Sequence, residues 1–263
     1  MYPTLLQFGS FRIDTYSVIW FIALSLAIIW AIKRLELYEL DEDESRRIMS
    51  ISFLFMILGA MAFKHIKKIP LYIADPSLIP SLSNWGLSEM GAIMGAFISA
   101  FILCMFSKKI SFMKLCDVSV IPAILSIAIG RWGCFLNGCC VGLRSDFFMA
   151  VHFPFDKAGV TRHPVQIYYS VIAFLIVMIL IYAEKKILPI QTQKKKYHSV
   201  ITPLGLILYA LMRFSIAPLR NRSTLWYMIL HAPTYQVLGV VFPLVCVWLA
   251  YSLLRIKADS SYR

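Results

Sequence analysis

Seven long apolar blocks constrain the fold of this chain more than any other feature of its sequence. Each approaches the roughly 20 residues that an α-helix needs to cross about 30 Å of hydrocarbon. With 59% hydrophobic and 15% charged residues, the chain is too apolar for a soluble domain. We therefore predict an all-α polytopic membrane protein with about seven transmembrane helices in one integral-membrane domain, 1–263. The blocks are 14–32, 48–63, 91–107, 115–133, 165–183, 200–219 and 234–254.

The basic residues predict the orientation. With the N-terminus outside and the C-terminus cytoplasmic, more than half of the 26 basic residues face the cytoplasm. The first block is expected to remain as a span, because Lys33-Arg34 follows it in place of a small-residue cleavage site. The net charge of +12 lies in short clusters beside spans, which suits anionic membrane lipids and gives no sign of nucleic-acid binding. The residues assigned to the cytoplasm are Lys33, Arg34, Arg46, Arg47, Lys108, Lys109, Lys114, Lys185, Lys186, Lys194, Lys195, Lys196, Arg255, Lys257 and Arg263.

Two connecting segments, 64–90 and 138–164, are predicted to be external. The first begins with a basic cluster and carries Trp85, which suits lipid phosphates and the membrane interface. The second mixes charged residues and histidines with four phenylalanines. We expect it to form a small cap over a site.

The stretch 130–142 is the strongest candidate for that site. It closes an apolar run of about sixteen residues with an arginine, an asparagine and three cysteines. A guanidinium near membrane depth costs on the order of 3 kcal/mol or more. Arg131 is therefore expected to line a polar cavity and to pair there with a carboxylate or a phosphate.

The cysteines of this stretch, Cys134, Cys139 and Cys140, leave three interpretations open. With His163 they offer zinc ligands, but C-x4-C-C is not a standard ligand spacing and it straddles a predicted helix end. A disulfide is a second possibility. We favour simple packing at a tight helix break, and we predict no metal and no cofactor.

The stretch 130–142 resembles the signature G-R-x-G-N-F-x-N-x-E-x-x-G of the prolipoprotein diacylglyceryl transferases. This resemblance implies a seven-span enzyme of the bacterial inner membrane. Its expected partners are phosphatidylglycerol as donor and the lipobox cysteine of a preprolipoprotein as acceptor. Further parts of the family pattern appear along the chain in the order that the family has. They are Tyr16 in the first span, Asp117, His163-Pro164-Val165-Gln166-Ile167-Tyr168, Arg213-Phe214, Arg220 and Gln236.

Several positions depart from the family pattern. The histidine of its S-F-H-G-G motif, a proposed base, is replaced here by Met90. The arginine of a G-G-R motif in the second span is replaced by Met61. An asparagine and three glutamates of the family pattern are replaced by Cys134, Cys139, Ala217 and Tyr169.

The remaining polar residues predict how such a transfer would proceed. Arg131 and Arg213 would hold the departing phosphate, because guanidinium groups bind phosphate bidentately and stay charged. A general base must take the proton of the acceptor. The candidates for the base are Glu89, His163 and His65, and those for substrate binding are Tyr16, Asn137, Gly138, Gly142, Gln166 and Arg220.

Purely structural alternatives exist for three of these residues. Tyr16 suits the aromatic belt at the interface, His163 suits a helix start set by Pro164, and Arg220 suits an external flank.

Two other functions also fit the sequence. One is a divergent paralogue with a phospholipid donor and a glycan or hydroxyl acceptor. The other is a catalytically silent lipid-binding membrane protein. The sequence leaves open the acceptor, the base, the oligomeric state and the presence of a disulfide.

Overall fold

The fold is seen in a computed structural model that describes residues 2–8, 11–65, 69–75, 88–107, 109–193 and 199–220. The chain forms two compact units. The first comprises residues 1–34 and 116–231, and the second comprises residues 35–115 and 232–263.

Six of the seven predicted apolar blocks form helices, and the seventh, 234–254, lies outside the described residues. Among the described residues five helices are long and apolar enough to cross a membrane, and Gly91–Phe106 adds a shorter apolar helix. The polytopic helical architecture predicted from the sequence is therefore confirmed. The helices are α1 (Thr15–Arg34), α2 (Glu42–His65), α3 (Ile69–Ala74), α4 (Glu89–Phe106), α5 (Phe112–Leu136), α6 (Val165–Gln193) and α7 (Ile201–Arg220), with a short 3₁₀ turn at Glu36–Tyr38.

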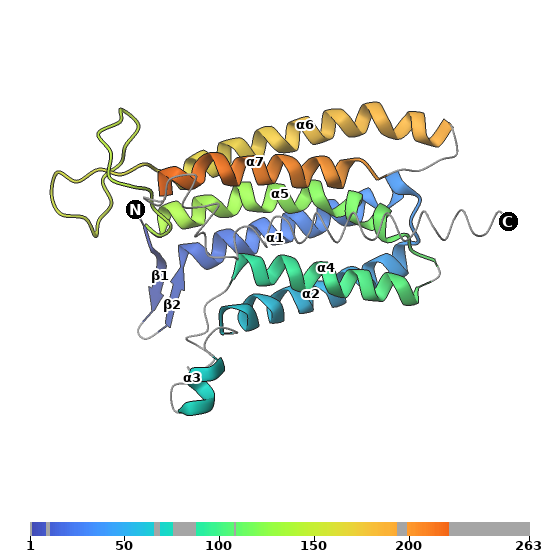
Figure 1. The fold of residues 1–263 in the computed structure, drawn as a ribbon, viewed down its shortest axis with the longest axis horizontal. Coiled ribbons are helices and arrows are strands. Elements are labelled where there is room, and N and C mark those ends of the chain that lie inside the picture. The colour runs from blue at the N-terminus through green and yellow to red at the C-terminus, as the bar shows by residue number, and fades with distance from the viewer. Residues whose placement is uncertain are drawn as a thin grey trace. The chain divides into compact units, whose positions relative to one another are not determined.

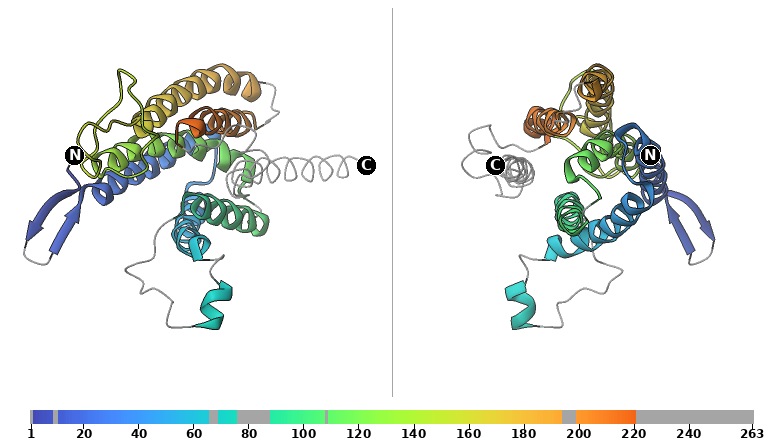
Figure 2. Two further views of the ribbon diagram at one scale, coloured as in Figure 1. Left: turned by 60° about the vertical axis from the view of Figure 1, so that its left-hand side comes forward. Right: turned by 90° about the vertical axis from the view of Figure 1, so that its right-hand side faces the viewer.

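Helices α1, α5, α6 and α7 run side by side in the first unit (Figures 1 and 2). Its interior is lined by residues such as Ile121, Ala173 and Leu180, all fully buried. Large apolar side chains also face outward, including Phe21 and Met178, which are 73% and 65% exposed. An apolar exterior is what a helix bundle presents to hydrocarbon, where all backbone polar groups must be satisfied within the helices.

A buried ion pair joins α1 to α6 in the first unit. Arg34 donates two hydrogen bonds to the carboxylate of Glu184, at 2.8 and 2.6 Å, and both residues are 5% exposed. The same guanidinium donates to the carbonyl oxygens of Val118 and Asp117, at 2.9 and 3.0 Å. These four hydrogen bonds make the buried charge tolerable, because the guanidinium is both paired with a carboxylate and hydrogen-bonded.

Asp117 has a structural role at the same end of the unit. Its Oδ1 accepts hydrogen bonds from the backbone N–H of Thr202 and from the hydroxyl of Ser199, both at 2.7 Å, and from the hydroxyl of Thr202. A carboxylate that accepts from the first-turn N–H groups of a helix stabilises its N-terminus. Asp117 of α5 therefore anchors the start of α7.

The second unit is built on the pair α2 and α4, which lie in close contact (Figure 2). Glycines allow this approach: a Cβ atom added at Gly59 would lie 3.1 Å from the Cα atom of Gly95 and would collide with the backbone of Gly91. Small residues at a helix crossing let two backbones pack directly, as is common in membranes.

A two-stranded antiparallel hairpin precedes α1 and was not expected from the sequence. Strand β1 (Thr4–Phe8) pairs with β2 (Phe11–Asp14), and Thr15 at the start of α1 donates from its hydroxyl to the carbonyl of Tyr2 at 2.5 Å. Strands of four or five residues carry too little periodicity to be separated from a polar N-terminal extension.

The segment 138–164 forms an extended loop at the end of α5. Two isolated bridges pair Arg162 with Arg144 and with Val151, and an ion pair joins Arg162 to Asp156 at 2.7 Å. That guanidinium holds the pKa of the Asp156 carboxyl below its usual range. The other segment predicted to be external, 64–90, is described only at 64–65, at 69–75 including α3, and from Ser88 onward.

Candidate active site

The candidate site begins where α1 crosses α5. A Cβ atom added at Gly130 would lie 2.6 Å from the ring of Trp20, and one at Gly133 would lie 3.3 Å from the backbone carbonyl of Tyr16. These two glycines, one turn apart on α5, therefore leave room for the first turns of α1. Arg131 and Cys134 follow them directly and share this crossing.

The C-terminus of α5 explains why two of the cysteines are neighbours. Gly138 adopts a left-handed φ of 69°, the N–H of Gly138 donates to the carbonyl of Phe135 at 3.1 Å, and the N–H of Cys139 donates to the carbonyl of Cys134 at 3.0 Å. This is the Schellman arrangement of a helix end, which brings the second residue after the cap back over the last turn. The motif thereby places Cys139 beside Cys134.

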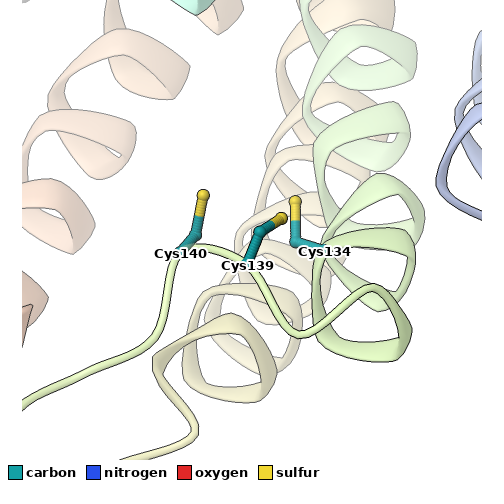
Figure 3. A group of neighbouring side chains, drawn as sticks. All are labelled: Cys134, Cys139 and Cys140. Atoms are coloured by element: carbon teal, nitrogen blue, oxygen red, sulfur yellow. The ribbon is translucent and has the colours of Figure 1, made fainter. Parts of the chain in front are cut away.

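Cys140 completes this group. It has a positive φ of 60°, which among the described non-glycine residues is shared only with Glu39. The three Sγ atoms lie within 4.8 Å of one another, and Figure 3 shows the side chains gathered at the end of the helix. Hydrogen bonds from Cys134 and Cys139 lower the pKa of the Cys140 thiol, and the charges of Arg220 and Arg131 act in the same direction.

Arg131 and Arg213 meet at one aromatic ring. The guanidinium carbon of Arg131 lies 4.6 Å from the ring centroid of Tyr169, and that of Arg213 lies 5.7 Å from the same centroid. Tyr169 is only 2% exposed and Arg131 only 5%. Cation–π attraction to a shared ring holds two like charges together, and this attraction is strongest where water is excluded.

Gln166 connects this pair to the cysteine loop. Its Nε2 donates to the carbonyl of Cys139 at 2.6 Å, which fixes the orientation of the amide. The side chain is 1% exposed, and no described residue donates a hydrogen bond to its Oε1. A buried acceptor without a donor is costly, so Oε1 is a contact point for a ligand that carries a donor.

Gly142 lies where the cap loop crosses the start of α6. A Cβ atom there would lie 2.6 Å from the carbonyl oxygen of His163 and 2.8 Å from the side chain of Val165. Backbone hydrogen bonds from Gly142 to His163, at 3.1 Å, and from Leu143 to Leu219, at 2.8 Å, tie the loop to α6 and α7. The end of α5, the start of α6 and the end of α7 are thus joined around Arg131.

A family model described as "Prolipoprotein diacylglyceryl transferase" matches residues 3–252 of the chain. The chain belongs to this family. The resemblance drawn from 130–142 and the later motifs is therefore confirmed, and the protein is a polytopic membrane enzyme of the diacylglyceryl transferase type.

Relatives named phosphatidylglycerol–prolipoprotein diacylglyceryl transferase align along most of the chain. That of Finegoldia magna is 28% identical over 254 residues, which cover 96% of this chain and 97% of the relative. That of Clostridium novyi is 31% identical over 250 residues, or 92% of each chain. That of Clostridium tetani is 30% identical over 189 residues, or 71% and 75%.

Several residues predicted for substrate binding surround the Arg131 region of this transferase. Tyr16 lies within electrostatic range of Arg131 and of the three cysteines. Asn137 is exposed and its side chain is hydrogen-bonded to Cys139. Gly138 forms the helix cap, and Arg220 ends α7 close enough for its charge to act on Cys140.

The three candidates for the base are divided between the two units. The ring of His163 contacts Tyr168, with 3.3 Å between Nδ1 and the hydroxyl oxygen, and lies 5.9 Å from the ring of Phe147. His163 thus belongs to the aromatic side of the cap. Glu89 is the first residue of α4 in the second unit, which is described separately. His65, the third candidate, is also in that unit and contacts the hydroxyl of Tyr72 at 2.8 Å.

Tyr169 is the site residue that sequence reasoning missed. It was interpreted only as the loss of a glutamate from the family pattern, yet it is the ring on which both arginines rest. Its position three residues after Gln166 was an available signal, because residues i and i+3 share one face of a helix.

Proposed function

We propose that this protein transfers the diacylglyceryl group of phosphatidylglycerol to the thiol of the lipobox cysteine in a prolipoprotein. The observation that carries the proposal is the pair of guanidinium groups on the buried ring of Tyr169. The names of the relatives give the donor and the acceptor. We place the reaction at the outer leaflet of a bacterial inner membrane, where the segment 138–164 would cover the site.

The reaction is a substitution at the carbon of the diacylglyceryl group that is bonded to the phosphate oxygen. The acceptor sulfur forms a bond to this carbon while the carbon–oxygen bond to the phosphate breaks. Glycerol phosphate leaves, and the proton of the thiol is released. Arg131 and Arg213 would bind the phosphate oxygens and stabilise the charge that grows on them in the transition state. Fixed donors in a site without bulk water do this better than water does.

Neighbouring residues would position the donor lipid. The Oε1 atom of Gln166 would accept a hydrogen bond from a glycerol hydroxyl of the headgroup. Tyr16 and Asn137 supply a hydroxyl and an amide at the rim of the same region. Gly138 and Gly142 act through the backbone, because the turn and the loop crossing that they allow shape the floor of the site.

The proposal is tested with the purified full chain, labelled phosphatidylglycerol and a lipobox peptide. Lipidated peptide and free glycerol phosphate are the expected products. Arg131→Ala should lower the initial rate by at least about 100-fold, as for removal of a single preorganised donor. Arg131→Lys should also be poor, since the bidentate fork is lost.

Arg46→Ala is the matched control, because Arg46 is an exposed arginine whose partner is Glu42 on the same helix. Full activity of Arg131→Ala would mean that the phosphate of the donor binds elsewhere in the protein. Lipid binding without product from the peptide, together with product from a glycan or hydroxyl acceptor, would favour the divergent paralogue.

A further inference from the structure

The cysteine group at the end of α5 is not explained by the phosphate site. Cys134 lies in the last turn of α5, Cys139 and Cys140 follow the cap at Gly138, and the three Sγ atoms lie within 4.8 Å of one another (Figure 3). Around a tetrahedral Zn²⁺ ion with bonds of about 2.3 Å, thiolate sulfurs lie about 3.8 Å apart. Small side-chain rotations would therefore bring all three sulfurs onto one ion.

We propose that Cys134, Cys139 and Cys140 bind one Zn²⁺ ion whose open fourth position takes the thiolate of the acceptor cysteine. This deepens, and rests on, the function proposed above. Three protein ligands with a free fourth position are the pattern of a catalytic zinc, whereas a structural zinc has all four positions filled by protein. The site lacks a fourth ligand of its own among the described cysteine, histidine and carboxylate residues.

The surroundings of the group favour an anionic metal–thiolate centre. Arg131 lies three residues before Cys134 on α5, and its guanidinium carbon lies 4.6 Å from the ring centroid of the buried Tyr169. Gln166 holds the carbonyl of Cys139 through its Nε2 at 2.6 Å. Outer partners of this kind orient metal ligands.

The formal charges balance when both substrates are bound. Zn²⁺ with three cysteine thiolates and the acceptor thiolate carries two negative charges, and the phosphate of the donor lipid carries one. Arg131, Arg213 and Arg220 supply three positive charges. Such compensation is needed because uncompensated charge in a region without water is strongly disfavoured.

The zinc would also take over the role of the general base, which is to remove the proton of the acceptor thiol. In this chain Met90 replaces the histidine of the family pattern, so another group must activate the thiol. A thiol that coordinates zinc is deprotonated by the metal. The proton of the acceptor goes to water when its sulfur binds, the sulfur then attacks the glyceryl carbon, and the carbon–oxygen bond to phosphate breaks. The thioether product is a neutral and weaker ligand, so it leaves the ion.

Metal binding is tested first, on the reduced full chain in detergent under nitrogen. Protein stripped with a chelator should take up one Zn²⁺ per chain. Co²⁺ in place of Zn²⁺ should give the d–d bands of a tetrahedral site and a sulfur-to-cobalt charge-transfer band. Cys134→Ser, Cys139→Ser and Cys140→Ser should each lose this binding, whereas Cys104→Ser, a buried cysteine of α4, should keep it.

A second variant guards against misfolding. Cys134→Asn combined with Cys139→Glu restores the residues that the family pattern carries, so it should fold and yet bind no Zn²⁺. Absence of Zn²⁺ and Co²⁺ binding by the reduced wild-type chain would overturn the proposal. So would a disulfide within the group that persists in the active enzyme.

The fourth position is tested with a lipobox peptide and no lipid. The peptide should shift the Co²⁺ d–d bands, and the same peptide with serine in place of cysteine should not. Stripping the metal should lower transfer by at least about 100-fold, in line with the loss of a group that activates the nucleophile, and Zn²⁺ should restore it. Undiminished transfer by metal-free enzyme would defeat the zinc proposal and leave the transferase function standing. Binding of zinc and of the peptide without any transfer would leave the zinc site standing and defeat the transferase function.

Discussion

At the scale of single residues, Tyr169 organises the candidate site. Two guanidinium groups repel each other, and in a membrane neither is well solvated. The negative face of an aromatic ring offsets part of that cost, by about 2 kcal/mol or more where the contact is desolvated. Under the proposed function, Arg131 and Arg213 would thereby be held in place before the phosphate of the donor binds, which would reduce the reorganisation needed for catalysis.

Replacing the Tyr169 ring should therefore disturb the arginines without removing them. Tyr169→Leu should lower kcat by about 10-fold or more, because small displacements of catalytic groups cost up to about 100-fold. Tyr169→Phe keeps the ring face and should stay within about 3-fold of wild type. Initial rates with labelled phosphatidylglycerol measure both effects.

Tyr182→Leu is the control, since Tyr182 is an exposed tyrosine of the same helix. A Tyr169→Leu enzyme as active as this control would mean that the ring does not position the arginines.

The residues of the site were predictable from the sequence to different degrees. Arg131 stood out because a charge beside an apolar run is costly unless it has a partner. The structure buries it against Tyr169. Gln166 was singled out by its motif, but its unsatisfied Oε1 depends on packing that no motif reports. The role of Tyr169 was missed because a tyrosine stands here in place of a glutamate of the family pattern. The negative face of its ring nevertheless attracts both guanidinium groups.

At the scale of elements, a helix end and a loop crossing build the site. The Schellman cap at Gly138 reverses the chain after α5, and the loop then passes the start of α6 at Gly142. Both features depend on glycine, for different reasons. Gly138 has a left-handed φ, whereas Gly142 is required by the nearness of the backbone carbonyl of His163.

Gly142→Ala should therefore be harmful despite its small size. The new methyl group would lie 2.6 Å from a backbone oxygen, so the loop or α6 must move. We expect a lower Tm and a loss of activity of about 10-fold or more, because the displaced loop carries the cysteine cap. Thermal unfolding in detergent and transfer assays measure the two effects.

Gly159→Ala offers a comparison in the same loop. A Cβ atom there meets nothing within 4 Å, and only the left-handed φ of 81° opposes the substitution. Its expected cost is about 1 kcal/mol. Equal effects of the two substitutions would argue against the close approach at Gly142.

The helices were the easiest elements to predict and the loops the hardest. Apolar blocks of about twenty residues have one stable form in hydrocarbon, because only a helix satisfies the backbone within one segment. The predicted and observed bounds therefore agree within three residues for four of the first six blocks, whereas α2 begins six residues before its block and α6 ends ten residues after its block. The hairpin of β1 and β2 and the bridges of Arg162 depend on pairings between short segments, which have no signature in periodicity.

At the scale of the molecule, the first unit is polar at both ends of α1 and apolar between them. Tyr16, near the site, and Arg34, in the ion pair with Glu184, are separated by 18 residues of helix, or about 27 Å. This distance matches the hydrocarbon thickness of about 30 Å. We therefore expect the candidate site and the ion pair to lie at the two membrane interfaces of this unit.

The charges at these interfaces predict which of them faces the cytoplasm. Lys33, Lys185 and Lys186 accompany the ion pair at one end of the unit. At the other end Arg131 and Arg213 lie over the ring of Tyr169 and Arg162 pairs with Asp156, so these three arginines do not act as free flanking charges. The positive-inside rule counts such flanking lysines and arginines, and it places the lysine end in the cytoplasm.

Reporter fusions test this orientation directly. A fusion after Gln193, at the end of α6, should report a cytoplasmic location, and one after Lys157, in the cap loop, should report an external one. Paired reporters that are active on opposite sides of the membrane make each result positive. A cytoplasmic signal at Lys157 would put the cap and Arg131 on the inner face, where an acceptor already exported across the membrane has no access to them.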